Sequence, residues 1–234
     1  MSPPAAAAAA TAHYGPSPAA RVRRIFDILS QSIRPESDLE YEGPFQLLVA
    51  VVLSAQATDT SVNRATRTLF AVANSPQAII DLGVDGLIPH IRHIGLYNAK
   101  AKHVVQLCQA LRDRHQGQVP DNRAALQALP GVGRKTASVV LNIAFGQPEI
   151  AVDTHVHRVS NRLGISATSS VDHTEQVLLA RTPRKHRLHA HHYLILHGRY
   201  TCTARNPQCG HCPLAKLCPS RQEAGVTPKR PRKD

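Results

Sequence analysis

The sequence predicts an all-α protein, and three observations lead to that class. Apolar residues recur at helical spacing along most of the middle of the chain, and short connections containing glycine or proline separate these stretches. No stretch alternates polar and apolar residues around hairpin turns, as half-buried strands would. With 234 residues, 42% of them hydrophobic, the chain is long enough to bury a core in one large or two small domains.

The expected helices follow one another through the folded part of the chain. Apolar periodicity predicts the first four at residues 22–33, 45–54, 62–72 and 99–111. Two more, at 122–129 and 134–145, flank a short turn, and a helix at 154–163 follows with Asp153 or Thr154 as its N-cap. The last two helices are expected at 174–181 and 186–199.

The two ends of the chain differ from its middle in composition. Residues 1–20 are rich in alanine and of low complexity, and residues 221–234 are basic and contain two prolines. Both segments predict disordered tails, and the N-terminal one lacks the basic start of a secretory signal.

The charge of the chain points to its class of partner. The formal net charge is +12, which favours a polyanion, with nucleic acid first and an acidic membrane surface second. No apolar run approaches the roughly 20 residues of a membrane span. We therefore expect a DNA or RNA partner and no membrane.

The turn in the middle of the chain, in "LPGVGRKTASVVLN" (129–142), is typical of a helix-hairpin-helix. Pro130 ends the first helix, and Gly131 and Gly133 allow positive φ and a close backbone approach. The free N–H groups of the turn and of the next helix would then form an anion site for a DNA phosphate. Such binding is independent of base sequence. The alternative is a plain glycine-rich connection between helices.

Two charged residues near this turn are candidates for chemistry. Lys135 lies in the first turn of the second helix, where the helix N-terminus, Arg134 and partial burial would favour the neutral amine of a Schiff-base nucleophile. Asp153 follows within reach, because the eight residues after Phe145 span up to about 26–29 Å. The alternatives are a solvated lysine and an ordinary helix cap.

Four cysteines near the end form a compact ligand pattern. Cys202, Cys209, Cys212 and Cys218 follow the spacing C-x6-C-x2-C-x5-C. The candidate occupants are a [4Fe–4S] cluster, zinc or disulfides, of which disulfides fit least well. Spacing alone leaves iron–sulfur and zinc open. Cys108 is expected in the core, and His189–His192 on the surface or facing phosphate.

Together these motifs resemble the endonuclease III family of DNA glycosylases. The resemblance runs from Arg21 to Cys218 and rests on "VLSAQATD", "IGLYNAKA", "LPGVGRKTA", "AVDTH" and "LILHGRYTC", followed by the cysteine spacing. It implies a six-helix barrel domain at 37–147 and an iron–sulfur cluster domain at 21–36 and 148–220, with a cleft between them.

The resemblance also implies an activity and its residues. It implies removal of oxidised or ring-saturated pyrimidines, such as thymine glycol, from duplex DNA and scission at the abasic site, with Lys135 as nucleophile and Asp153 assisting base loss. The four cysteines would hold a [4Fe–4S] cluster, while Gln56 and Leu96 would fill the gap left by the flipped nucleotide. An exposed Leu96 would favour that role over one in the core. The remaining DNA-binding residues expected are Gly131, Val132, Gly133, Arg134, Thr136 and His155.

Other readings remain open on the sequence. One is a monofunctional mismatch glycosylase for thymine or adenine, and another is a non-catalytic DNA-binding module with a structural metal. A third is a redox sensor whose cluster controls DNA affinity. The expected enzyme is a monomer on double-stranded DNA, in the cytoplasm with the nucleoid if bacterial, with nucleus and mitochondrion as alternatives.

Overall fold

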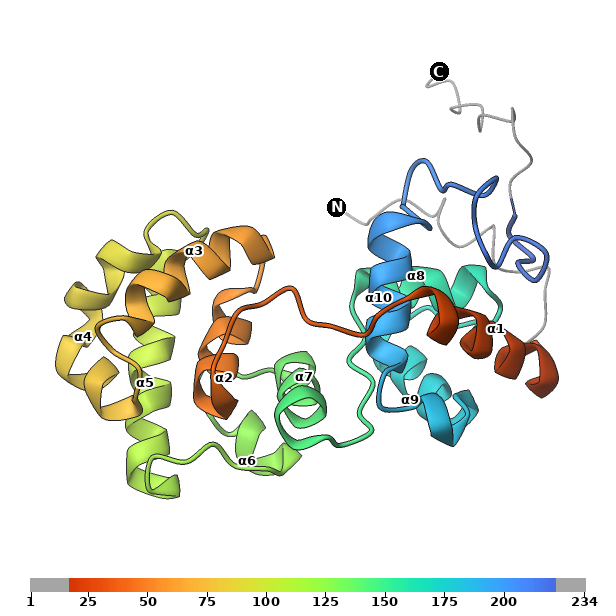
Figure 1. Cartoon of the computed structure of the whole chain (residues 1–234). Helices are drawn as coiled ribbons and strands as arrows, with labels where there is room; N and C mark the ends of the chain where they lie inside the picture. Colours follow the sequence, from red (N-terminus) through yellow and green to blue (C-terminus); the bar gives the residue numbers. More distant parts are fainter. Residues whose placement is uncertain (1–16, 222–234) are drawn as a thin grey trace, which may run out of the picture. The chain divides into compact units, whose positions relative to one another are not determined.

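The computed structural model describes residues 17–221, and over that range the chain is helical with no strand (Figure 1). The predicted all-α class is therefore confirmed. None of the helices within this range is long and apolar enough to cross a membrane. The α-helices are α1 (Ala19–Ser32), α2 (Gly43–Leu53), α3 (Asp59–Phe70), α4 (Pro76–Ile91), α5 (Tyr97–His115), α6 (Arg123–Gln127), α7 (Arg134–Phe145), α8 (Thr154–Arg162), α9 (Val171–Arg181) and α10 (Ala190–Tyr200), with a 3-10 turn η2 (Arg184–His186).

Helices α2 to α7 belong to one compact unit, Glu36–Ala151. Within it α4 packs on α5 and α3, α2 packs on α7, α3 and α5, and α6 packs on α7. One continuous apolar core joins these helices, and its members include Leu48, Leu53, Leu69, Ile91, Leu107 and Leu141. Burial of this shared core, rather than helix propensity, holds the short helices in place.

Helix α4 is absent from the helices that the sequence predicts, and its local geometry explains why. Gly83 has φ 68° and ψ 179°, so two helical pieces meet at a kink within Pro76–Ile91. Gly86 and Pro89 lower the helix propensity further. Ser75 caps the start by accepting a hydrogen bond from the Ala78 N–H at 3.2 Å, and Ile79, Leu87 and Ile91 are buried. Tertiary packing therefore stabilises a helix that local preference does not favour.

The observed unit extends beyond residue 147, where the sequence analysis placed its end. The Asn142 side chain donates to the carbonyls of Gln147 at 3.1 Å and Glu149 at 3.0 Å, and Arg123 pairs with Glu149. These contacts hold the segment after α7 against α6 and α7, so it stays in the unit up to Ala151.

Helices α1, α8, α9 and α10 belong to the second unit, formed by the described residues before Glu36 and after Ala151. Helix α10 packs on α8 and α1, and α8 packs on α9. The predicted N-terminal tail is too long by four residues. Ser17 is buried and its N–H donates to the Gly164 carbonyl at 2.9 Å, and α1 starts at Ala19. The rest of both predicted tails, 1–16 and 222–234, lies outside the described residues.

The histidine-rich start of α10 also differs from the expectation. His191 and His192 are buried, 6% and 8% exposed, with ring centroids 5.3 Å apart. The prediction that they lie on the surface is wrong, because α10 is enclosed by its packing against α8 and α1. Cys108 is buried in the core as predicted, and this burial raises the pKa of its thiol to about 12.

Candidate functional site

The hairpin turn between α6 and α7 is built around Gly131. This residue has φ 77°, and a Cβ added there would lie 3.1 Å from the Cβ of His103 and 3.5 Å from a methyl of Val52. A side chain would be strained by the backbone and crowded by its neighbours. The next residue, Val132, is 6% exposed and anchors the turn in the core. Glycine at position 131 thus lets the turn pack directly on α5 and α2.

The second hairpin glycine, Gly133, is the N-cap of α7. Its φ of −86° and ψ of 177° suit any residue, no side chain caps the helix there, and an added Cβ would meet nothing within 4 Å. A Ser or Asp at this position would turn its own oxygen onto the first N–H groups of the helix. Glycine leaves the approach to them open, which suits an anion such as a phosphate.

Lys135 lies in the first turn of α7, and its side chain is exposed. The expectation of partial burial is therefore wrong. Arg134 is also exposed and Thr136 is partly buried. The hairpin thus presents both cations on the surface, beside the start of a helix whose positive end favours anions.

The two hairpin glycines give a paired prediction. Gly131→Ala is expected to lower the stability of the protein by about 1–3 kcal/mol, because it forces a strained φ and a close contact. Gly133→Ala is expected to fold normally but to bind duplex DNA more weakly, because its methyl group stands in the open approach to α7. Denaturant unfolding and fluorescence anisotropy of both variants check this. Equal unfolding midpoints for the two would contradict the packing argument.

Gln56 and Leu96 lie close together in the same unit. A Cβ added at Gly95 would lie 3.9 Å from the Gln56 carbonyl oxygen, so the turn after α2 touches the turn before α5. Both residues have left-handed backbones, with φ 55° for Gln56 and 60° for Leu96, and both side chains are exposed. Leu96 is 63% exposed, as expected for a wedge rather than a core residue. A left-handed non-glycine residue costs energy and tends to occur where function requires it.

Of the two candidate caps, Asp153 and Thr154, the N-cap of α8 is Asp153. Its Oδ1 accepts a hydrogen bond from the Val156 N–H at 2.8 Å, and its side chain is partly exposed. His155, one residue into α8, lies 3.3 Å from the Arg158 guanidinium through its Nδ1. Lys135 and Asp153 belong to different compact units. That the chain brings them together on one substrate stays a prediction.

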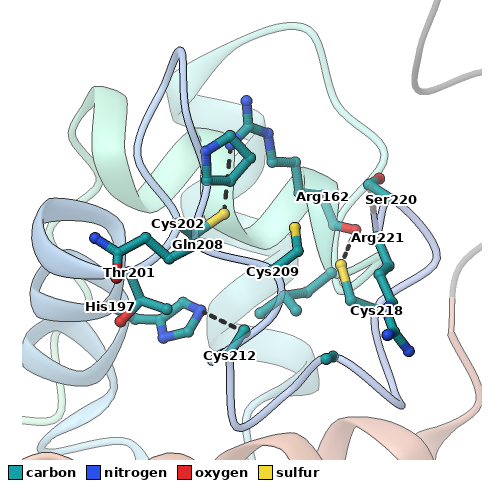
Figure 2. A pocket seen from close by; sticks show the side chains of 13 residues that line it. Arg162, His197, Thr201, Cys202, Gln208, Cys209, Cys212, Cys218, Ser220 and Arg221 are labelled. Atoms are coloured by element: carbon teal, nitrogen blue, oxygen red, sulfur yellow. Dashed lines mark hydrogen bonds between the residues drawn. The ribbon is translucent and has the colours of Figure 1, made fainter. Parts of the chain in front are cut away.

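The four C-terminal cysteines line one pocket, together with Arg162 and other residues (Figure 2). None of them forms a disulfide. Burial, with the neighbouring thiolates adding to it, raises the pKa of Cys218 to about 11 and also raises the pKa of Cys212. A cationic iron core bound by the four cysteines would stabilise their thiolate forms and offset the cost of burying them.

Two arginines that the sequence analysis did not single out hold this cysteine loop to α8. Arg162 donates to the carbonyls of Thr203 at 2.7 Å and Ala204 at 2.8 Å, and its Nη1 lies 3.4 Å from the Cys202 sulfur. Arg158 donates to the carbonyls of Gly198 at 2.9 Å and Cys202 at 3.1 Å. Their spacing of one helical turn on α8 is the only sequence signal that could have indicated them.

His197 completes the surroundings of the cysteines. Its Nε2 lies 3.7 Å from the Cys212 sulfur, and burial lowers the pKa of its imidazole to about 4. Over residues 17–221, no three His, Cys, Asp or Glu side chains are grouped so as to hold a single metal ion. In a [4Fe–4S] cluster each cysteine binds a different iron atom, so the donor set of four thiols around one pocket fits that group.

Two family models match this chain. Residues 49–184 match the HhH-GPD superfamily base excision DNA repair protein, and residues 202–218 match the iron-sulfur binding domain of endonuclease III. The second match spans all four C-terminal cysteines and resolves the choice that their spacing left open. With the endonuclease III relatives reported below, this match assigns a [4Fe–4S] cluster as the cofactor.

Individual endonuclease III proteins are also similar in sequence to this chain over most of their length. Endonuclease III of Haemophilus influenzae is 52% identical over 203 residues, covering 87% of this chain and 96% of that protein. Endonuclease III of Escherichia coli K12 is 52% identical over 192 residues, covering 82% of this chain and 91% of that protein.

Solved structures share the fold. A trapped endonuclease III–DNA covalent intermediate has a TM-score of 0.82 at 44% identity, covering 87% of this chain and 97% of that one. A thermostable thymine-DNA glycosylase has a TM-score of 0.75 at 26% identity, covering 87% and 94%. The chain belongs to the endonuclease III family, within the HhH-GPD superfamily of base excision DNA repair proteins.

Proposed function

We propose that this base excision repair enzyme removes oxidised or ring-saturated pyrimidines from duplex DNA and then cleaves the abasic strand through a lysine Schiff base. The observation that carries the proposal is the exposed Lys135 in the first turn of α7, directly after the hairpin. With a phosphate of the strand bound at the hairpin, the Lys135 amine would lie next to a sugar of that strand. A related endonuclease III has been trapped covalently on DNA.

Access to the target comes first, because a base inside the duplex is out of reach. Flipping a nucleotide out of the stack costs a few kcal/mol. Gln56 and Leu96 are exposed, lie in adjacent turns and are proposed to enter the gap. Apolar wedges of this kind offset unstacking and stabilise a kinked duplex. The hairpin glycines, Gly131 and Gly133, would hold a phosphate nearby.

The chemical step is a substitution followed by an elimination. The neutral Lys135 Nζ attacks C1′ of the sugar, the C1′–N bond breaks, and the base leaves with the bonding electrons and then takes up a proton. Opening of the sugar ring gives a protonated imine between Lys135 and C1′. Loss of a C2′ proton then expels the 3′ phosphate oxygen, which breaks the strand. Water hydrolyses the imine and frees the lysine.

Asp153 is proposed to act in base loss rather than in strand scission. Positive charge develops on the sugar as the C1′–N bond breaks, and a fixed carboxylate stabilises that charge. The hydrogen bond from the Val156 N–H holds one carboxylate oxygen of Asp153 in place. An orientation fixed before the reaction costs no reorganisation at the moment when charge appears.

The iron–sulfur cluster is proposed to shape the surface that meets DNA. Cys202, Cys209, Cys212 and Cys218 would hold it, and the chemistry it supplies when bound is structural cross-linking of the loop. Through Arg158 and Arg162 the same loop is tied to α8, the helix that begins after Asp153.

We also propose where the enzyme acts and in what form. The relatives named above are bacterial, so we propose that it acts in the cytoplasm with the nucleoid. We further propose that it acts as a monomer.

Borohydride trapping tests the proposed function directly. The unaltered protein is mixed with a duplex carrying one thymine glycol, and in parallel with a duplex carrying one abasic site, and borohydride is added to each. A covalent protein–DNA band on both substrates is expected, because reduction of the imine fixes the lysine to the sugar. Base release without any covalent band on either duplex would instead indicate a monofunctional glycosylase, such as one acting on mismatched thymine.

A further inference from the structure

Lys100 is a buried cation in α5. Its side chain is 5% exposed, and its Nζ donates a hydrogen bond to the Leu53 carbonyl oxygen at 2.9 Å. Lys102, two residues further along the same helix, is exposed in the ordinary way. Lysine is among the residues least often found buried, so a specific partner must compensate for its lost hydration.

The compensation comes from the end of α2. Leu53 is the last residue of that helix, whose final carbonyl groups have no partner within the helix. The Ser54 N–H already donates to the carbonyls of Ala50 and Val51. Lys100 supplies a donor to the Leu53 carbonyl and places positive charge at the negative end of the helix. Desolvation by burial lowers the pKa of Lys100.

The same residue is tied to the turn before α5. The backbone N–H of Lys100 donates to the Leu96 carbonyl at 3.0 Å, which is the first helical hydrogen bond of α5. Its side chain binds the residue that ends α2, three positions before Gln56. One residue therefore connects the two turns that carry the exposed Gln56 and Leu96. No side chain caps α5 at Leu96, so this connection is not duplicated by an N-cap.

We propose that Lys100 is a positioning residue that fixes the spacing of Gln56 and Leu96 for entry into the gap left by the flipped nucleotide. The inference rests on the proposed function, since it needs a flipped nucleotide and a gap. Lys100 touches neither DNA nor the reacting atoms; it acts through the two turns. Both turns hold left-handed residues, which depend on the surrounding contacts to keep their conformation.

The consequence is a selective loss of activity on paired DNA. Lys100→Met keeps an unbranched side chain that is one atom shorter, but it removes the donor and leaves the buried Leu53 carbonyl unpaired. We expect this substitution to slow the extrusion of a nucleotide from a duplex. An abasic site in single-stranded DNA needs no wedge, so its trapping rate should change less. We expect the ratio of trapping rates, duplex over single strand, to fall by roughly tenfold to a hundredfold, the scale on which a 1 Å misplacement acts.

The experiment measures borohydride trapping of the full chain on one abasic site, in a duplex and in the matching single strand. Lys102→Met is the control, because it removes the same charge from an exposed position of the same helix, and its ratio is expected to match that of the unaltered protein. Lys100→Arg keeps charge and donor but displaces the donor. For Lys100→Arg we expect a smaller fall in the ratio of trapping rates, duplex over single strand. This variant tests the proposal even if Lys100→Met does not fold.

A second readout needs no turnover. Saturating protein is bound to a duplex with a reduced abasic site opposite 2-aminopurine, whose fluorescence rises on unstacking. Lys100→Met is expected to give a smaller rise than the unaltered protein. Equal falls in trapping on both strands, or an unchanged ratio with an unchanged fluorescence rise, would make Lys100 merely structural and overturn the proposal. No trapping of any abasic DNA by the unaltered protein would instead contradict the proposed function, and this inference with it.

Discussion

Replacing Lys135 with arginine is expected to abolish covalent trapping and strand scission while leaving duplex affinity close to that of the unaltered protein. Arginine keeps the positive charge at the start of α7, but its guanidinium stays protonated and forms no imine with the sugar. Loss of a nucleophile acting in a concerted site costs several orders of magnitude, so we expect at least a roughly 10³-fold fall in scission. Single-turnover cleavage of an abasic duplex measures it.

A second substitution separates charge from nucleophilicity. Lys135→Gln removes both, so it is expected to lose scission to the same extent and also to bind duplex DNA somewhat more weakly than Lys135→Arg. The salt dependence of binding should become shallower by about one phosphate contact for Lys135→Gln only. If Lys135→Arg still cleaves at the native rate, another amine forms the imine and the assignment of Lys135 is wrong.

The helices that the sequence predicted are those whose local signals agree with their packing. In α7 the predicted range 134–145 matches the observed Arg134–Phe145, because a glycine stands at each end and apolar residues line the buried face. In α4 the signals conflict, since Gly83 breaks the helical backbone and Pro89 disfavours it. The helix forms there because its residues pack into a core shared with α3 and α5. Such tertiary packing cannot be inferred from a single sequence.

The same distinction applies to the candidate site. Spacing was enough to find the four cysteines and the hairpin, because ligand loops and tight turns are local. It was not enough for Lys100, Arg158 and Arg162, whose acceptors are backbone carbonyls 40 or more positions away. These are Leu53 for Lys100, Gly198 and Cys202 for Arg158, and Thr203 and Ala204 for Arg162. Exposure likewise depends on tertiary structure, so the sequence placed Lys135 partly inside and His191 outside, and both placements were wrong.

Asp153→Asn is expected to suppress base removal while preserving the fold of α8. Asparagine caps a helix about as well as aspartate, so the hydrogen bond from the Val156 N–H is retained and stability should change little. The negative charge is lost, however, and with it the stabilisation of the developing sugar cation. Release of thymine glycol should fall by roughly 10²–10³-fold, as for loss of one preorganised electrostatic group.

An abasic duplex distinguishes a role of Asp153 in base removal from a general loss of enzyme activity. There the base has already gone, so Asp153→Asn should cleave it far closer to the native rate than it processes thymine glycol. Asp172→Asn, which makes the same charge change at an exposed position in the first turn of α9, should leave both reactions unaltered. Asp153→Ala should lose the cap as well and cost about 1 kcal/mol in stability. If Asp153→Asn leaves base release intact and only Asp153→Ala lowers stability, Asp153 is a structural cap, and the positive charge on the sugar must be stabilised by another group.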